Sequence, residues 1–265
     1  MDKKDIVVVV PIYLPALSEM EAVSLKQCLD ILSDYSIVII KPENLDLSNI
    51  QSQFLLPKVV SFPDRCYRGI EAYNRLMLDV TFYKTFSSYT YMLVYQLDAY
   101  VFKDELFFWA SLGYDYIGAP WMPHQRKYWR FPSRSVWFVQ RCFWSIFYPK
   151  NLRRMKYCWV HVGNGGYSLR KISKMIAVTE HYKTIIDKCM ADSNPFFPED
   201  VFLLLNTYDK ESHLKRPSYK LAMKFAIEQI PAWSYRANGC QLPFGCHNWT
   251  HPEMLPFWSQ FIKLG

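Results

Sequence analysis

Four short segments of this chain carry side chains that could do chemistry, and the first ends a very apolar run. Asp98 closes the sequence Tyr95-Gln-Leu-Asp98, directly after the apolar residues Tyr91–Tyr95. A carboxylate at the end of a buried strand is costly unless it has a partner. A divalent cation that also binds phosphate is one such partner. Capping of the following turn explains the residue equally well.

The second segment places three glycines around one asparagine, in Gly163-Asn-Gly-Gly166. Glycines this close together indicate backbone that approaches another group closely. Their bare amides could hold the oxygens of a sugar or a phosphate, and a helix expected from about Leu169 could present its N-terminus to an anion. A hairpin turn that contains glycine is the alternative interpretation.

The third segment is a pair of carboxylates, Glu199 and Asp200, which open an apolar helix after Pro198. Acidic residues are common there because they complement the helix dipole. Asp200 could instead be a general base that takes a proton from a hydroxyl, with Glu199 orienting the molecule that carries the hydroxyl.

The fourth segment is a histidine in a late loop, His247 in Leu242-Pro-Phe-Gly-Cys-His-Asn-Trp249. A histidine in this setting could bind a metal or a phosphate. Packing among the neighbouring aromatic residues explains it at least as well.

Strands and helices alternate in the first half of the chain, which predicts an α/β fold with a mostly parallel, doubly wound sheet. Ligands of such sheets bind at the carboxyl ends of the strands, where Asp98 lies. The expected strands are Ile6–Ile12, Tyr35–Ile40, Lys58–Phe62 and Tyr91–Tyr95, and the expected helices are Ser18–Leu32 and Gly69–Phe86.

The second half is less regular, although we expect one domain over residues 1–265. The expected elements are a helix at Asp104–Leu112, a strand at Tyr114–Ile117, a loop at Val160–Leu169, and helices at Arg170–Tyr182 and Glu199–Leu205.

Taken together, the four segments resemble the motif set of GT-A-type glycosyltransferases. More closely, the chain resembles a poorly characterised family of bacterial glycosyltransferases that are found among surface-polysaccharide genes. The resembling strings are Tyr95-Gln-Leu-Asp-Ala-Tyr100, Tyr114-Asp-Tyr-Ile-Gly-Ala-Pro-Trp121, Gly163-Asn-Gly-Gly-Tyr-Ser-Leu-Arg170 and Pro243-Phe-Gly-Cys-His247.

The resemblance implies a Rossmann-like GT-A fold with helices on both faces of the sheet. It implies that residues 1–103 bind a nucleotide sugar and residues 104–265 bind a glycan or lipid-linked acceptor. Asp200 would be the base of an inverting transfer, with Glu199 beside it. The implied donor residues are Pro11, Ile12, Tyr13, Gln96, Asp98 and Tyr100, with Lys41-Pro42 near the nucleoside. The implied acceptor residues are Trp121, Asn164, Gly165, Gly166 and Trp249.

The resemblance also implies a divalent cation, Mn²⁺ or Mg²⁺, held by Asp98 and His247. Here the chain departs from the family pattern, because Tyr100 stands at the second acidic position of the Asp-x-Asp motif. Arg170, Lys171 or a tyrosine hydroxyl could steady the leaving group in place of the cation. If turnover has been lost, the chain would be a non-catalytic protein that binds a sugar nucleotide or a membrane lipid.

A basic aromatic segment, residues 124–159, interrupts the second half. From Tyr116 to Thr179 the chain has twelve Lys and Arg residues and no Asp or Glu. This composition suits a membrane surface, and it equally suits an insertion folded over the acceptor cleft. Nucleic-acid binding would leave the four motifs without a use, so we expect no nucleic-acid partner.

The N-terminal apolar run is not typical of an export signal, because Pro11 and Pro15 interrupt it and Asp2 and Asp5 dilute its positive charge. No uncharged apolar stretch reaches the ~18 residues that a membrane-spanning helix needs. We therefore expect a cytoplasmic protein, with peripheral contact at the inner face of the membrane.

Overall fold

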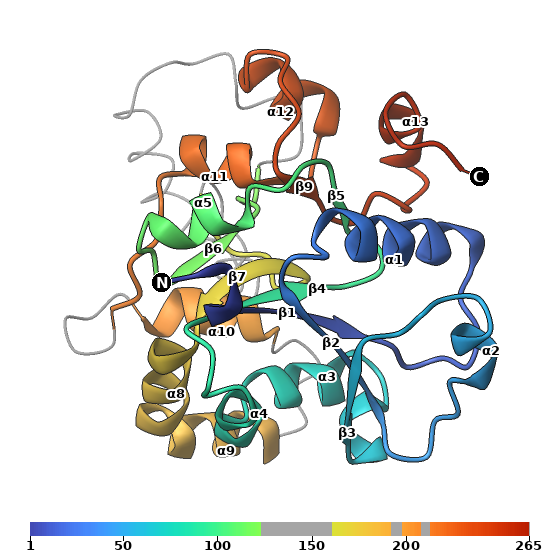
Figure 1. Cartoon of the computed structure of the whole chain (residues 1–265). Helices are drawn as coiled ribbons and strands as arrows, with labels where there is room; N and C mark the ends of the chain where they lie inside the picture. Colours follow the sequence, from blue (N-terminus) through green and yellow to red (C-terminus); the bar gives the residue numbers. More distant parts are fainter. Residues whose placement is uncertain (123–160, 192–197, 208–212, 265) are drawn as a thin grey trace, which may run out of the picture.

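The computed structural model describes residues 1–122, 161–191, 198–207 and 213–264, in which a central sheet lies between two layers of helices (Figure 1). The basic aromatic segment, residues 124–159, lies outside the described residues.

The main sheet of the described residues has the strand order β3-β2-β1-β4-β7-β6. Its strands are β1 (Ile6–Pro11), β2 (Ser36–Pro42), β3 (Lys58–Phe62), β4 (Tyr91–Tyr95), β6 (Tyr116–Gly118) and β7 (Tyr167–Lys171). The first four run parallel, whereas β7 is antiparallel to both β4 and β6. The expected mostly parallel sheet is confirmed, and two strands from the second half of the chain extend it.

Alternate residues of the central strands enter two separate cores. Val8 and Leu93 face a core that they share with the first helical layer, whereas Val9 and Met92 face the second layer. Because both faces are covered, these strands are continuous apolar runs rather than alternating ones. The first layer holds α1 (Glu19–Ile31), α2 (Ser48–Gln51) and α5 (Leu106–Ser111).

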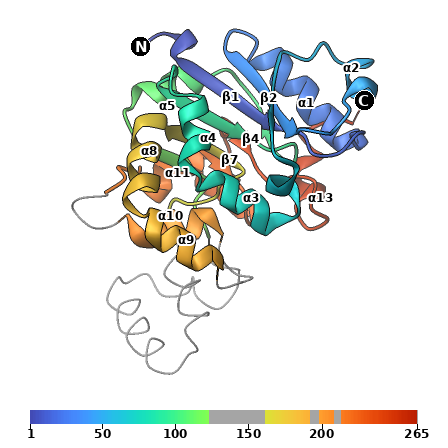
Figure 2. The same ribbon diagram turned by 90° about the horizontal axis from the view of Figure 1, so that it is seen from below.

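The second layer covers the side of the sheet that Figure 2 presents. It holds α3 (Ile70–Met77), α4 (Val80–Thr85), α8 (Ile172–His181), α9 (Lys183–Ala191) and α10 (Glu199–Asn206). Among the described residues, no helix combines the length and the apolar character that crossing a bilayer requires.

The helix expected over Gly69–Phe86 is two helices, α3 and α4. The chain leaves the helical conformation at Asp79, whose ψ angle is 124°. The Asp79 carboxylate then accepts a hydrogen bond from the backbone N–H of Thr81 and so caps α4. The single-helix prediction was wrong because an N-cap residue inside a helical pattern starts a new helix.

The largest difference from expectation is β7, which replaces the end of the predicted glycine loop and the start of a predicted helix. Tyr167–Lys171 pairs with β4, and α8 begins only at Ile172. The glycines precede β7, whereas α8 begins after it. The N-terminus of α8 therefore lies at the end of β7 that is farther from the glycines. Its predicted contact with an anion bound at the glycine loop is wrong.

A smaller sheet of the described residues has the order β5-β9-β8, from β5 (Tyr100–Val101), β9 (Gly245–Cys246) and β8 (Ala226–Ile227). β8 and β9 are parallel, with Ile227 opposite Cys246. Glu228 and His247 consequently leave neighbouring strands at equivalent positions. The helices around this sheet are α11 (Tyr219–Phe225), α12 (Pro231–Ala237) and α13 (Leu255–Trp258).

The central position of β4 predicts a strong dependence of stability on its buried residues. Leu93 is fully buried, so Leu93→Ala should lower the free energy of unfolding by about 2–5 kcal/mol through the lost burial and the cavity left behind. Leu55 is 96% exposed, and Leu55→Ala should change it by less than about 0.5 kcal/mol. Urea denaturation of both variants measures the contrast, and equal effects would contradict the assigned core.

Candidate active site

A cavity of about 650 Å³ opens where β1 and β4 end. Parallel strands bring their carboxyl ends to one edge of a sheet. β7 runs the other way and places Tyr167 opposite Tyr95, so the glycine loop before β7 reaches the same edge. The predicted residues that line this cavity are Pro11, Ile12, Tyr13, Gln96, Asp98, Asn164, Gly165, Gly166, Glu199, Asp200 and His247.

His247 is the centre of the polar contacts on one wall. Its Nε2 lies 3.2 Å from Asp98 Oδ1 and 3.2 Å from Gln96 Oε1. Its Nδ1 lies 3.1 Å from Asn164 Nδ2 and 3.3 Å from Glu228 Oε1. Burial opposes a charge on His247, but the carboxylates of Asp98 and Glu228 outweigh it and raise the pKa of His247 to about 10. An imidazolium held between two carboxylates is therefore the stable form at neutral pH.

Gln96, rather than Tyr100, accompanies Asp98 at the cavity. The chain turns after Gln96, where the N–H of Ala99 binds the Gln96 carbonyl. Gln96 and Asp98 both line the cavity, whereas Tyr100 lies in β5 and packs against Phe102 and Trp249. The donor-binding role of Tyr100 is thus not supported. The side chain beside Asp98 that could take the place of the second acid of the Asp-x-Asp motif is therefore the amide of Gln96.

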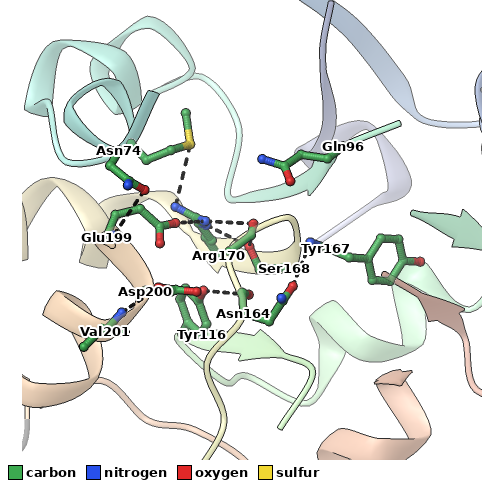
Figure 3. Close-up of polar contacts among 12 residues, drawn as sticks. Asn74, Gln96, Tyr116, Asn164, Tyr167, Ser168, Arg170, Glu199, Asp200 and Val201 are labelled. Atoms are coloured by element: carbon green, nitrogen blue, oxygen red, sulfur yellow. Dashed lines mark hydrogen bonds and ion pairs between the residues drawn. The ribbon is translucent and has the colours of Figure 1, made fainter. Parts of the chain in front are cut away.

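Glu199, which also lines the cavity, forms a buried ion pair with Arg170 (Figure 3). Arg170 is completely buried, and its Nη2 lies 2.5 Å from Glu199 Oε1. The same guanidinium donates to the hydroxyl of Tyr83 and to the carbonyl of Gly165. Arg170 is therefore committed to the core and does not steady a leaving group. Lys171 follows at the far end of β7, opposite Tyr91.

The glycines of the loop make room for side chains of the site. A Cβ on Gly165 would lie 2.4 Å from Glu199 Oε1, and one on Gly166 would lie 2.1 Å from His247 Nε2. Asn164, between two glycines, has a φ of +47° and binds Tyr167 N–H through its side chain. Gly165 and Gly166 line the cavity, and the groups that approach them closely are the side chains of Glu199 and His247.

Asp200 follows Glu199 at the start of α10 and faces the same cavity. Burial and the neighbouring charge of Glu199 raise the pKa of Asp200 to about 7, against a bond from the Val201 N–H to Asp200 Oδ1. A carboxylate with a pKa near neutrality is well matched to proton transfer.

Three residues implied for ligand binding lie away from the cavity. Trp249 is fully buried and donates its indole N–H to the Ala99 carbonyl, so its acceptor-binding role was wrong. Trp121 is not among the lining residues, and a Cβ on Gly163 would collide with its ring. The ammonium group of Lys41 donates hydrogen bonds to the backbone carbonyls of residues 42, 43 and 45.

Other residues that line the cavity belong to none of the motifs that can be recognised in the sequence. Glu228 belongs to no motif and reaches His247 only through the pairing of β8 with β9. Tyr67, Tyr73 and Asn74 come from the 3-10 helix η2 (Asp64–Tyr67) and from α3. The Asn74 side chain accepts a bond from the N–H of Glu199 and so joins α3 to the start of α10.

The donor atoms around His247 Nε2 suit a divalent cation. Asp98 Oδ1 and Gln96 Oε1 each lie 3.2 Å from this nitrogen, close to the ~3 Å that separates adjacent ligands of an octahedral ion. In the described part of the chain no three His, Cys, Asp or Glu residues are grouped so as to hold a metal ion. No Lys or Arg appears among the described residues that line the cavity.

The fold matches solved glycosyltransferases over most of the chain. An active-site mutant of LgtC aligns with a TM-score of 0.53 at 13% identity, covering 91% of this chain and 86% of that one. The galactosyltransferase LgtC in complex with donor and acceptor sugar analogs gives 0.50 at 12% identity with the same coverage. Mouse xyloside xylosyltransferase 1, in its apo form, gives 0.50 at 11% identity and covers 91% and 96%. The expected GT-A-type fold is confirmed.

The chain belongs to the family described as "Protein of unknown function (DUF5672)", whose model matches residues 57–247. No curated protein matches the chain.

The raised pKa of Asp200 predicts a pH-dependent stability. Because the pKa of about 7 exceeds the ordinary value of 3.8, the folded protein holds a proton that the unfolded chain releases. This contribution to stability is full below about pH 4 and is lost as the pH rises through 7. Asp200→Asn should therefore gain free energy of unfolding relative to the wild type between pH 4 and pH 8. Urea denaturation across this range measures the difference, and a constant difference would contradict the raised pKa.

Proposed function

We propose that the chain is a glycosyltransferase that moves a sugar from a nucleotide-sugar donor to an acceptor hydroxyl. The observation that carries this proposal is that one cavity is lined both by Asp98 with His247 and by Asp200 with Glu199. The first pair suits a diphosphate with its cation, and the second suits activation of a hydroxyl. The solved LgtC complex with donor and acceptor sugar analogs has the same fold, which supports the proposal.

The donor would enter at the ends of β1 and β4, with its nucleoside along Pro11–Tyr13. Tyr13 is half-exposed at the rim, where its ring is open to a nucleobase. Asp98, His247 and the Gln96 amide would hold Mn²⁺ or Mg²⁺. Such a cation neutralises the charge of a diphosphate leaving group, and the described cavity wall offers that charge no Lys or Arg. To bind this cation, His247 must lose the proton that the carboxylates of Asp98 and Glu228 stabilise on its imidazole.

Asp200 would act as the general base of an inverting displacement. Its carboxylate takes the proton from the acceptor hydroxyl as that oxygen bonds to the anomeric carbon, while the bond from that carbon to the diphosphate oxygen breaks. Glu199 shares the cavity wall, and burial together with the charge of Glu199 keeps the pKa of Asp200 high enough for this transfer.

The acceptor class that we propose is a glycan or a lipid-linked sugar in the synthesis of a surface polysaccharide or glycoconjugate. The basic composition of residues 124–159 supports a contact with anionic lipid at the cytoplasmic face of the membrane.

The role of Asp200 predicts a selective loss of turnover. Asp200→Asn keeps the size of the side chain but cannot accept the proton, so kcat should fall by about 10²–10⁴-fold while donor affinity stays unchanged. The wild-type rate should rise with pH through about 7 as Asp200 ionises, and the variant should lack this rise. Steady-state kinetics and calorimetry measure both.

The matched control is Asp30→Asn, which removes an exposed carboxylate of α1. It should retain wild-type kcat. Full turnover by Asp200→Asn would remove Asp200 from the mechanism, whereas an equal loss in both variants would indicate a general effect of charge.

A further inference from the structure

Polar atoms without a hydrogen-bond partner gather on the wall of the cavity. Among the described residues, the hydroxyl of Tyr67 and the Oε2 atom of Glu228 are buried and make no hydrogen bond, and the buried Tyr73 hydroxyl has a contact only with the Gln96 side chain. All three residues line the same cavity. A buried polar atom left without a partner is costly, so a cluster of them at one cavity indicates a polar ligand.

Glu228 is held in place by the fold and by one of its two oxygens. It follows β8 directly, next to His247, which follows β9. Its Oε1 faces His247 Nδ1 at 3.3 Å, while its Oε2 has no partner among the described residues. The charge of Glu228 is also felt at Asp200, where it raises the pKa of that carboxyl. The charge of Glu228 therefore acts on both His247 and Asp200.

We propose that Glu228 determines sugar specificity, its Oε2 atom accepting a hydrogen bond from a hydroxyl of the transferred sugar. This inference rests on the proposed function, because it assigns the sugar of a nucleotide-sugar donor to this part of the cavity. In this arrangement Oε1 contacts the His247 imidazole, and Oε2 accepts the hydrogen bond from the sugar hydroxyl.

The chemistry of the wall favours a hydroxyl over other ligand groups. A carboxylate repels a phosphate, and no Lys or Arg of the described lining offsets that repulsion. A cation would meet its ligands at His247 Nε2, whereas Glu228 lies on the Nδ1 side of the ring. A hydroxyl can donate to Glu228, and other hydroxyls of the same sugar can bond to Tyr67 and Tyr73.

Calorimetry that compares a nucleoside diphosphate with its nucleotide sugar tests this assignment. The probes are UDP against UDP-glucose and UDP-galactose, and GDP against GDP-mannose, titrated into the full chain. Glu228→Gln should weaken binding of the preferred nucleotide sugar by about tenfold or more, because the hydrogen bond to a charged acceptor is lost. Binding of the bare diphosphate should be retained or strengthened, because the variant removes a negative charge from the cavity wall.

Deoxy forms of the preferred sugar identify the hydroxyl. One of them should bind the wild type about tenfold more weakly than the full sugar and should lose nothing further in Glu228→Gln. Glu253→Gln, an exposed glutamate outside the cavity lining, is the matched control and should bind every probe as the wild type does. Glu228→Asp, which keeps the charge but withdraws Oε2, should show the same sugar-specific loss if Glu228→Gln does not fold.

The contrary outcomes separate the two proposals. Equal losses for diphosphate and nucleotide sugar would show that Glu228 acts only through His247. Unchanged binding in the variants, or no gain in affinity from any sugar of the panel, would also overturn its role. A wild type that binds no diphosphate would remove the proposed function itself.

Discussion

The buried guanidinium of Arg170 is the constraint on which the cavity depends. Arg170 belongs to β7 of the main sheet and has no exposure to solvent, and a charge in that position needs a partner and a full set of hydrogen bonds. Glu199 supplies the charge, while Tyr83, the Ser168 hydroxyl and the Gly165 carbonyl accept further hydrogen bonds. Satisfying Arg170 therefore brings α4, the glycine loop and the start of α10 together. Asp200 faces the cavity because it follows the residue that pairs with Arg170.

His247 is likewise held by charged partners, here two carboxylates. Asp98 arrives from the end of β4, and Glu228 arrives from the end of β8. Five acidic side chains line the cavity in the described residues, namely Glu21, Asp98, Glu199, Asp200 and Glu228, against His247 and no Lys or Arg. A diphosphate would be repelled by such a wall unless a cation came with it. This imbalance links the proposed use of Mn²⁺ or Mg²⁺ to the proposed reaction.

Much of the fold could be predicted because its strands are apolar runs, such as Ile6–Val10, that few other structures accommodate. Asp98, Asp200 and His247 could be found because each ends or begins a recognisable segment. β7 could not, since it contains Arg170, whose burial depends on Tyr83 and Glu199, which lie far from it along the chain. Glu228 lies 19 residues from His247 and meets it only through two-residue strands. Tyr100 was misplaced because the turn after Gln96 cannot be read from residue spacing.

The measurement that tests the account most directly is a screen of UDP-, GDP-, CMP- and dTDP-sugars, each with and without Mn²⁺. Thermal stability reports binding, and release of free nucleotide reports turnover. One nucleotide class should raise the melting temperature, Mn²⁺ should strengthen this effect, and the nucleotide should be slowly released. Absence of binding by every nucleotide sugar under both conditions would contradict the assignment of the cavity to a glycosyltransferase.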